Sequence, residues 1–125
     1  FTYHVPYSSV PPMVETETFA KLELELRRGA IVLAALSQLR TAQYGYSLRQ
    51  ALSARGMEID EGTLYPLLRR LETQGLLASE WRIEQGPPRR YYVLSPEGRK
   101  LYQKLLKTWR RLNVVMEDLT TEGGA

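Results

Sequence analysis

The chain has 125 residues and a formal net charge of +3, and it contains one histidine and no cysteine. This length allows one domain with a modest core. Without cysteine there is no disulfide framework, and one histidine cannot supply a zinc site or a histidine-based triad, so we expect no metal and no cofactor. We expect a cytoplasmic location and no membrane contact, because no stretch approaches the roughly 18 apolar residues of a spanning helix.

The charge is distributed unevenly along the chain. Residues 40–112 carry fourteen Lys or Arg against seven Asp or Glu, whereas residues 1–39 carry three against four and residues 113–125 carry none against three. A basic middle suits a polyanionic partner such as nucleic acid. Charge alone leaves the question open, because Lys and Arg are also common on solvated helix faces.

Residues 1–17 are expected to be an unstructured arm or a remnant added at cloning, since the first twelve hold three prolines and no periodicity. The next segment is ambiguous. Leucines alternate with charged residues over 21–26 as in a strand, but apolar residues then continue at spacings of four and three, which favours a helix. We expect a helix that begins between Thr18 and Arg27 and reaches Leu39.

Two short helices are predicted next. A turn at residues 40–44 leads to a helix at 47–55 that Gly56 ends, and Asp60 is placed to cap the following helix. That third helix combines a buried stripe of leucines with an outward face of polar, aromatic and basic side chains. The stripe is Leu64, Leu67, Leu68 and Leu71, and the outward residues are Thr63, Tyr65, Pro66, Arg69 and Arg70. Pro66 should loosen the helix, because it removes a hydrogen bond to Gly62.

From Leu77, side chains alternate between two faces with a period of two residues, as in a strand. The same alternation resumes at residues 91–94 after a loop at 84–88, which predicts a β-hairpin. Arg89 and Arg90 lie at its tip beside two prolines and suit a phosphate or minor-groove contact. A basic hairpin directly after a recognition helix is the arrangement that a winged helix uses on DNA.

The last helix is predicted from Pro96 to about Leu119, with Ser95 as its N-cap. It carries an apolar seam at spacings of three and four: Tyr102, Leu105, Trp109, Leu112, Met116 and Leu119. A small core cannot cover a helix of about 35 Å, so the seam predicts homodimerisation. The alternative is that the helix folds back on its own domain.

The sequence therefore predicts a mainly α fold with a small β-hairpin. We expect a winged helix-turn-helix domain at residues 18–94, a C-terminal dimerisation helix at 95–120 and a flexible tail at 121–125.

Five ordered motifs between about residues 20 and 119 resemble the PadR family of transcriptional regulators. They are Tyr44-Gly45-Tyr46, the run from Gly62 to Glu72, Gly75-Leu76-Leu77, the run from Gly86 to Tyr92, and Ser95-Pro96-Glu97-Gly98. The single short C-terminal helix is similar to the smaller subfamily, which includes multidrug-responsive repressors. The resemblance implies a homodimeric repressor that binds a double-stranded DNA operator and is released by a small ligand.

Two positions depart from the family pattern. Pro88 stands where the family wing often has a third basic residue, so one phosphate contact is expected to be lost. Asp60 stands where the cap of the recognition helix is often Ser or Thr. Its charge suits a helix N-terminus but repels phosphate.

Eight residues are the candidate DNA contacts: Tyr46, Thr63, Tyr65, Pro66, Arg69, Arg70, Arg89 and Arg90. Some have a second interpretation. Arg69 and Arg70 also fit a solvated helix face, Tyr65 also fits a half-buried position, and Tyr46 also fits packing on the first helix.

Trp109 has two interpretations as well. The seam pattern alone favours a residue of the dimer core. In the smaller PadR-like proteins, a Trp from each subunit lines an aromatic-binding pore at the dimer centre, so the resemblance implies a platform for a planar aromatic or phenolic ligand. The lining expected on this interpretation is Leu26, Ala30, Leu105, Trp109 and Asn113.

Two other functional classes were compared with a DNA-binding regulator. A winged-helix module that binds an acidic protein would keep the seam but would not distinguish an operator from random DNA. An enzyme is not expected, because the carboxylate cluster Glu58, Asp60 and Glu61 has no metal ligand or nucleophile–base pair beside it.

Overall fold

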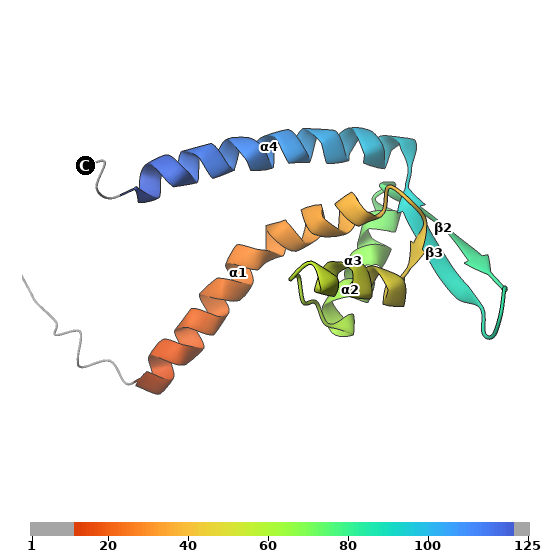
Figure 1. The fold of residues 1–125 in the computed structure, drawn as a ribbon, viewed down its shortest axis with the longest axis horizontal. Helices are drawn as coiled ribbons and strands as arrows, with labels where there is room; N and C mark the ends of the chain where they lie inside the picture. The colour runs from red at the N-terminus through yellow and green to blue at the C-terminus, as the bar shows by residue number, and fades with distance from the viewer. Residues whose placement is uncertain (1–11, 122–125) are drawn as a thin grey trace, which may run out of the picture. The chain divides into compact units, whose positions relative to one another are not determined.

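The computed structural model describes residues 12–121. Its elements are α1 (Pro12–Gln38), β1 (Gln43–Tyr44), α2 (Gly45–Ala54), α3 (Glu61–Thr73), β2 (Leu77–Arg82), β3 (Arg89–Leu94) and α4 (Pro96–Thr120) (Figure 1). The chain divides into two compact units, one that ends at Ala30 and one that starts at Ile31, and α1 contributes to both. The predicted fold class, mainly helical with a small antiparallel sheet, is confirmed.

The first helix starts earlier than predicted. It begins at Pro12 rather than between Thr18 and Arg27, so residues 12–17 of the expected arm are helical. A proline is well tolerated at a first helical position, and Glu15 in the first turn suits the positive end of the helix dipole. The rest of the expected arm, residues 1–11, and residues 122–125 of the expected tail lie outside the described residues.

The core of the second unit is built from the predicted leucines. All four members of the α3 stripe are buried, and they pack with the end of α1, with α2 and with the sheet. The largest fully buried side chains among the described residues are Leu36, Leu39, Leu48, Leu64 and Leu68. Tyr102, predicted as the first residue of the dimer seam, belongs to this core and is only 6% exposed. Its position near the start of α4 places it on its own domain rather than on a partner.

The sheet has three strands in the order β1-β3-β2, whereas the sequence predicted only the hairpin. The added strand pairs antiparallel with β3, Gln43 opposite Tyr92 and Tyr44 opposite Tyr91. Two residues are too few to show an alternating pattern, so this segment was predicted as a turn. The short strand fixes the start of α2 beside the hairpin.

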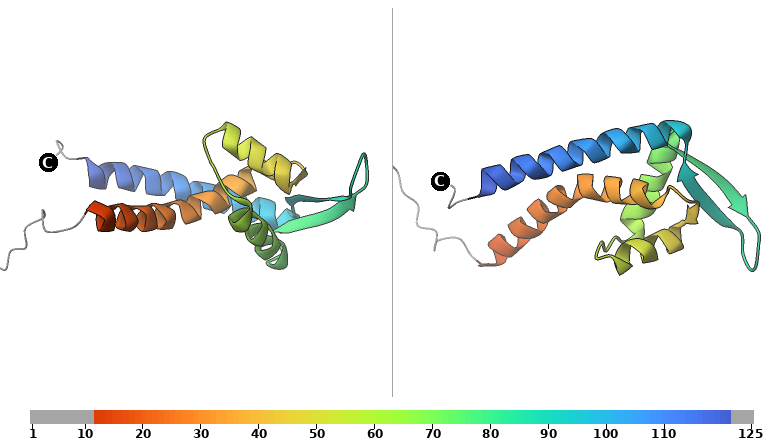
Figure 2. Two further views of the ribbon diagram at one scale, coloured as in Figure 1. Left: turned by 90° about the horizontal axis from the view of Figure 1, so that it is seen from below. Right: turned by 45° about the horizontal axis from the view of Figure 1, so that its top comes forward.

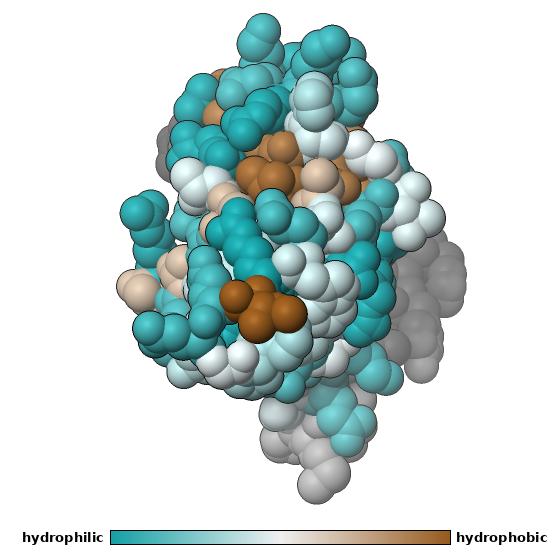
Figure 3. Space-filling view, turned by 90° about the vertical axis from the view of Figure 1, so that its right-hand side faces the viewer, coloured by the Kyte–Doolittle hydropathy of each residue, from teal (hydrophilic) through white to brown (hydrophobic). Residues whose placement is uncertain are grey.

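The β2–β3 hairpin projects from the helices in both views of Figure 2. Leu77 and Leu94 at its base are buried, but Trp81 and Ile83 toward its tip are exposed. The surface at this end of the molecule is mostly hydrophilic, with small hydrophobic patches (Figure 3). The outer half of the hairpin therefore lies beyond the core.

The predicted helix caps are present at both sites. The Asp60 carboxylate accepts a hydrogen bond from the Thr63 N–H at 3.1 Å, and the Ser95 hydroxyl oxygen accepts one from the Gly98 N–H at 3.0 Å. The loosening expected at Pro66 is not seen as a break, because α3 stays helical from Glu61 to Thr73. Gly62 and Pro66 are both exposed, so water can hydrate the carbonyl that lacks its helical donor.

The C-terminal half of α4 is exposed. Leu105 and Leu106 are half-buried against the core, but every residue from Lys107 to Thr120 is exposed. Within residues 12–121, no helix combines the length and the hydropathy needed to cross a bilayer.

Candidate nucleic-acid interface

The outward face of α3 carries the predicted contact residues in accessible positions. Thr63, Pro66, Arg69 and Arg70 are all exposed. Within residues 12–121, the guanidinium groups of Arg69 and Arg70 have no acidic partner. Glu61, at the start of the same helix, pairs instead with Arg49 of α2 at 3.1 Å. Arg69 and Arg70 are therefore available to an anionic partner.

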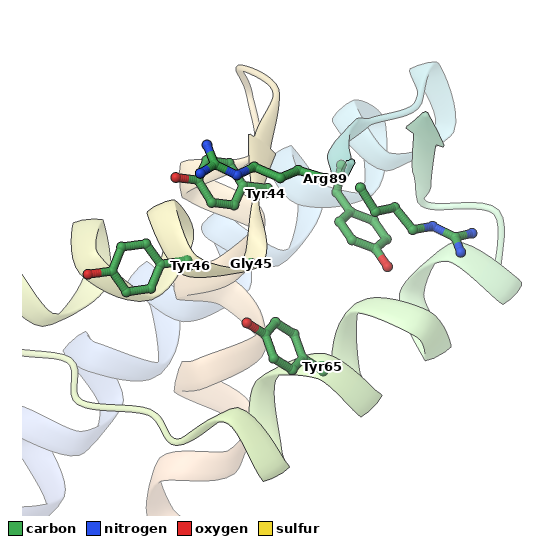
Figure 4. Close-up of a pocket in the computed structure, with 7 residues that line it drawn as sticks. Tyr44, Gly45, Tyr46, Tyr65 and Arg89 are labelled. Atoms are coloured by element: carbon green, nitrogen blue, oxygen red, sulfur yellow. The ribbon is translucent and has the colours of Figure 1, made fainter. Parts of the chain in front are cut away.

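Tyr65 is the half-buried residue of this face, as one of its two interpretations stated. Its ring packs against the start of α2, where a Cβ added to Gly45 would lie 2.0 Å from Tyr65 Cε1. The missing side chain at Gly45 is what lets the two helices approach (Figure 4). Gly45 thus positions Tyr65.

Tyr46 lies in the first turn of α2 and is 52% exposed. Its ring stacks near Tyr44, with centroids 6.4 Å apart, and its hydroxyl accepts a hydrogen bond from Gln50 Nε2 at 2.8 Å. The hydroxyl proton of Tyr46 stays available for a second acceptor.

Arg89 lies over an aromatic ring that sequence reasoning missed. Its Cζ atom is 4.6 Å from the centroid of the Tyr44 ring, and Arg82, the cross-strand partner of Arg89, lies 4.3 Å from the centroid of the Tyr91 ring. Such contacts orient a guanidinium while leaving its N–H groups free. Counting strand positions outward from the loop at Gly86 would have placed Arg82 opposite Arg89. The contact between Arg89 and Tyr44 had no such signal, because the two residues are far apart in the sequence.

Arg90, predicted as a DNA contact, is paired with groups of its own domain, although its side chain is 40% exposed. One of its terminal nitrogens lies 3.0 and 3.2 Å from the two carboxylate oxygens of Glu72, and its Nε donates to Ser79 Oγ at 3.1 Å. The Ser79 hydroxyl donates in turn to Glu72 at 2.5 Å. This hydrogen bond, together with Arg90, lowers the pKa of Glu72 and keeps its carboxylate charged.

A pocket of about 430 Å³ opens among these residues (Figure 4). Its lining is Tyr44, Gly45, Tyr46, Tyr65, Arg89, Arg90 and Tyr92. Aromatic rings form the walls, hydroxyl groups offer donors, and Arg89 supplies a cation. This chemistry suits an anionic oxygen bound beside an apolar group, as in a sugar–phosphate backbone.

One anionic group lies at the edge of this face. Asp60 is exposed at the start of α3, and the hydrogen bond from Thr63 lowers the pKa of its carboxyl. The site therefore keeps a negative charge at the start of α3. Among residues 12–121 there is no group of three or more His, Cys, Asp or Glu side chains able to hold a metal ion.

The residues predicted for a ligand are divided between the two units. Leu26 and Ala30 belong to the first unit, whereas Leu105, Trp109 and Asn113 follow each other at spacings of four along α4. The structure therefore brings only the last three to one helix face. Trp109 is 40% exposed on that face.

Comparison with known proteins identifies a family for this architecture. Residues 32–104 match the model of the transcriptional regulator PadR-like family. The chain is 43% identical over 76 residues to the transcriptional regulator Rv3488 of Mycobacterium tuberculosis, a match that covers 60% of this chain and 71% of the relative.

Solved structures agree with this assignment. A PadR family transcriptional regulator from Eggerthella lenta is 43% identical, with a TM-score of 0.78 over 88% of this chain and 99% of that chain. A PadR family regulator from Clostridium difficile is 30% identical, with a TM-score of 0.67 over 73% of this chain and 98% of that chain. The chain belongs to the PadR-like family of transcriptional regulators, which bind DNA.

Proposed function

We propose that this chain is a homodimeric repressor in the cytoplasm that binds a pseudo-palindromic operator and is released by a planar aromatic or phenolic ligand. The observation that carries the proposal is that one chain has both a basic surface and an exposed apolar helix face. Exposed basic residues lie on α3 and the hairpin, and α4 continues beyond that domain with an exposed apolar seam.

The seam supports the dimer. Four of its six predicted residues, Trp109, Leu112, Met116 and Leu119, are between 40% and 71% exposed, and Val115 widens the stripe. Burying one such side chain fully is worth about 1.5–3 kcal/mol. A second copy of the same helix offers a seam of matching period, and the resulting two-fold symmetry suits an operator with two half-sites.

The arrangement of the basic residues supports the DNA contact. Arg69 and Arg70 are exposed on α3, and Arg89, on the hairpin, lines the pocket. We assign a backbone phosphate to the pocket, with Arg89 and the hydroxyls of Tyr46 and Tyr65 as its donors. Thr63 and Pro66, exposed on the first turns of α3, are assigned to base edges.

Release by a ligand follows from the position of Trp109. Two copies of this ring, one from each subunit, would form the walls of a slot at the dimer axis, with Leu105 and Asn113 one turn away on either side. A ligand there must favour one dimer geometry, because equal binding to both geometries would shift nothing.

The DNA component is tested with the intergenic region beside the chain's own gene. Fluorescence anisotropy should show binding to this duplex at least about 10³-fold tighter than to a scrambled duplex of equal length. Equal affinity for both duplexes would contradict operator binding and favour the alternative, a winged-helix module that binds acidic proteins.

The ligand component is tested by tryptophan fluorescence with a panel of planar cationic dyes and phenolic acids. Quenching should disappear in Trp109→Leu, which keeps an apolar side chain in the seam, and should persist in Trp81→Phe, which removes the other tryptophan. If no compound gives quenching that depends on Trp109, this residue is only part of the dimer core.

A further inference from the structure

We propose that Glu72, Ser79 and Arg90 form a clamp that fixes the hairpin against the recognition helix, and that Arg90 contributes to DNA binding through this clamp rather than by contacting phosphate. The proposal rests on the proposed operator binding. It assigns positioning roles to three side chains, of which only Arg90 was predicted to contact DNA.

The clamp joins three elements. Glu72 lies near the end of α3, Ser79 lies in β2, and Arg90 lies in β3. Each member bonds to both of the others, so the three side chains form a closed triangle with distances of 2.5–3.2 Å. Arg90 uses two nitrogens, Nη2 on Glu72 and Nε on Ser79, so its planar guanidinium holds a defined orientation, unlike a single-point ion pair.

The clamp lies where the hairpin leaves the core. Tyr92, opposite Ser79, is buried, but Trp81, opposite Arg90, is 63% exposed. Beyond this level β1 no longer pairs with β3, so the hairpin continues as two strands. A two-stranded hairpin is marginally stable alone, and a tie to α3 at this level therefore determines where its outer half points.

The environment of Arg90 agrees with a positioning role. Its guanidinium carbon lies 5.8 Å from the centroid of the Trp81 ring and 5.7 Å from that of the Tyr92 ring. Its charge is matched by Glu72, whereas Arg89, one residue earlier, lies exposed over Tyr44. Adjacent arginines thus differ in their partners: Arg89 lies over a tyrosine ring, whereas Arg90 is paired with a carboxylate.

Glu72→Gln separates positioning from charge. Removing a carboxylate beside the DNA would tighten binding if only charge mattered, because the phosphates are negative. The clamp predicts the opposite, a loss of operator affinity of roughly tenfold, because glutamine replaces one of the two oxygens that accept from Arg90 and Ser79 with an NH2 donor and removes the charge. Glu80→Gln is the matched control, since it removes a carboxylate from β2, next to Ser79 but outside the clamp. It should not weaken binding.

Arg90→Lys gives the complementary test. It keeps the positive charge, so a phosphate contact would largely survive, but it loses the fork that meets Glu72 and Ser79. We expect roughly the same tenfold loss, no further loss in the double variant with Glu72→Gln, and an unchanged slope of log affinity against log salt. Arg89→Ala should instead lower that slope by about 0.9.

A measurement without DNA separates the clamp from operator binding. Hydrogen exchange of the backbone amides at residues 81, 82, 89 and 90 should accelerate in Glu72→Gln and Arg90→Lys, while the amides of α2 and α3 keep their protection. Unchanged exchange in the hairpin, or tighter operator binding by Glu72→Gln, would overturn the clamp. Wild-type protein that fails to prefer its operator would overturn the proposed function, whatever the exchange shows.

Discussion

The region from α3 to β3 and the second half of α4 differ in how their apolar side chains are covered. In the first region the leucines of α3 are buried and its helix start is capped by Asp60. In the second, Leu112 and Met116 are about half exposed on a helix that leaves the domain. The first region can fold with contacts from its own chain, whereas the second presents an apolar face that a second chain would cover.

This difference separates two kinds of substitution. Changes in α3 or the hairpin should alter folding or DNA binding of each chain by itself. Changes along the exposed part of α4 should alter association while each DNA-binding domain stays folded. The following predictions test that separation in order of decreasing effect.

The double substitution Leu112→Lys and Met116→Lys should have the largest effect. Two unpaired charges in an apolar interface cost several kcal/mol, on the order of 3–5 kcal/mol for each uncompensated buried charge. Sedimentation should show a folded monomer, and operator affinity should fall by at least about 100-fold because the two half-sites no longer bind together. Val114→Lys, 71% exposed on the opposite side of α4, is the matched control and should leave the dimer intact. A dimeric double variant would contradict the assignment of the seam.

Leu68→Ala should destabilise the domain itself. This side chain is 0% exposed in the core, and truncation of such a leucine costs about 2–5 kcal/mol. Leu119→Ala, at a side chain that is 71% exposed, should change unfolding only where dimers are populated. Denaturant titrations at several protein concentrations distinguish the two effects. The separation fails if Leu68→Ala is neutral at every concentration.

Gly45→Ala, a change in α2, should displace the Tyr65 ring of α3. The new Cβ would lie 2.0 Å from Tyr65 Cε1, so the ring must move, at a cost of about 1–3 kcal/mol for overpacking. Thermal stability and operator affinity should both fall. Gly62→Ala on α3 is the control for the stability measurement, because its Cβ would meet its nearest neighbour, Asp60 Oδ2, at 3.8 Å. Equal stability of the two variants would show that Tyr65 is free to move.

Asp60→Asn should have the smallest effect. Asparagine caps helices as well as aspartate does, so the stability at neutral pH should change little, while loss of the negative charge should raise operator affinity a few-fold at most. Because the folded chain lowers the pKa of Asp60, its ionised form stabilises the fold above the pKa of the unfolded chain, and this contribution is lost as the pH falls through the lowered pKa. Acid unfolding of the asparagine variant should lack that contribution. An unchanged acid transition would contradict the role of the carboxylate.

Sequence reasoning predicted the elements whose signals are local. The leucine stripe of α3, the cap at Asp60 and the stop at Gly56 depend on residues a few positions apart. The hairpin was also predicted from the alternation in its strands, although its register was not. These features account for the fold class and for the exposed face of the recognition helix.

Features that depend on distant residues were missed. Glu72 and Arg90 are eighteen positions apart, and their contact requires both the turn after α3 and the register of β2 and β3. The two residues of β1 form a strand only because they pair with β3. Tyr102 fits the spacing of the seam but is buried in its own domain. The spacing of apolar residues along a helix does not show which of them contact the core and which remain exposed.

The stoichiometry on DNA tests the central claim most directly, because it depends on both regions at once. Analytical ultracentrifugation of the chain with a duplex from beside its own gene should give two chains per duplex, and a duplex that holds one half-site should bind far more weakly. One chain per duplex at full affinity, or equal binding to a scrambled duplex, would contradict a dimeric operator-binding regulator.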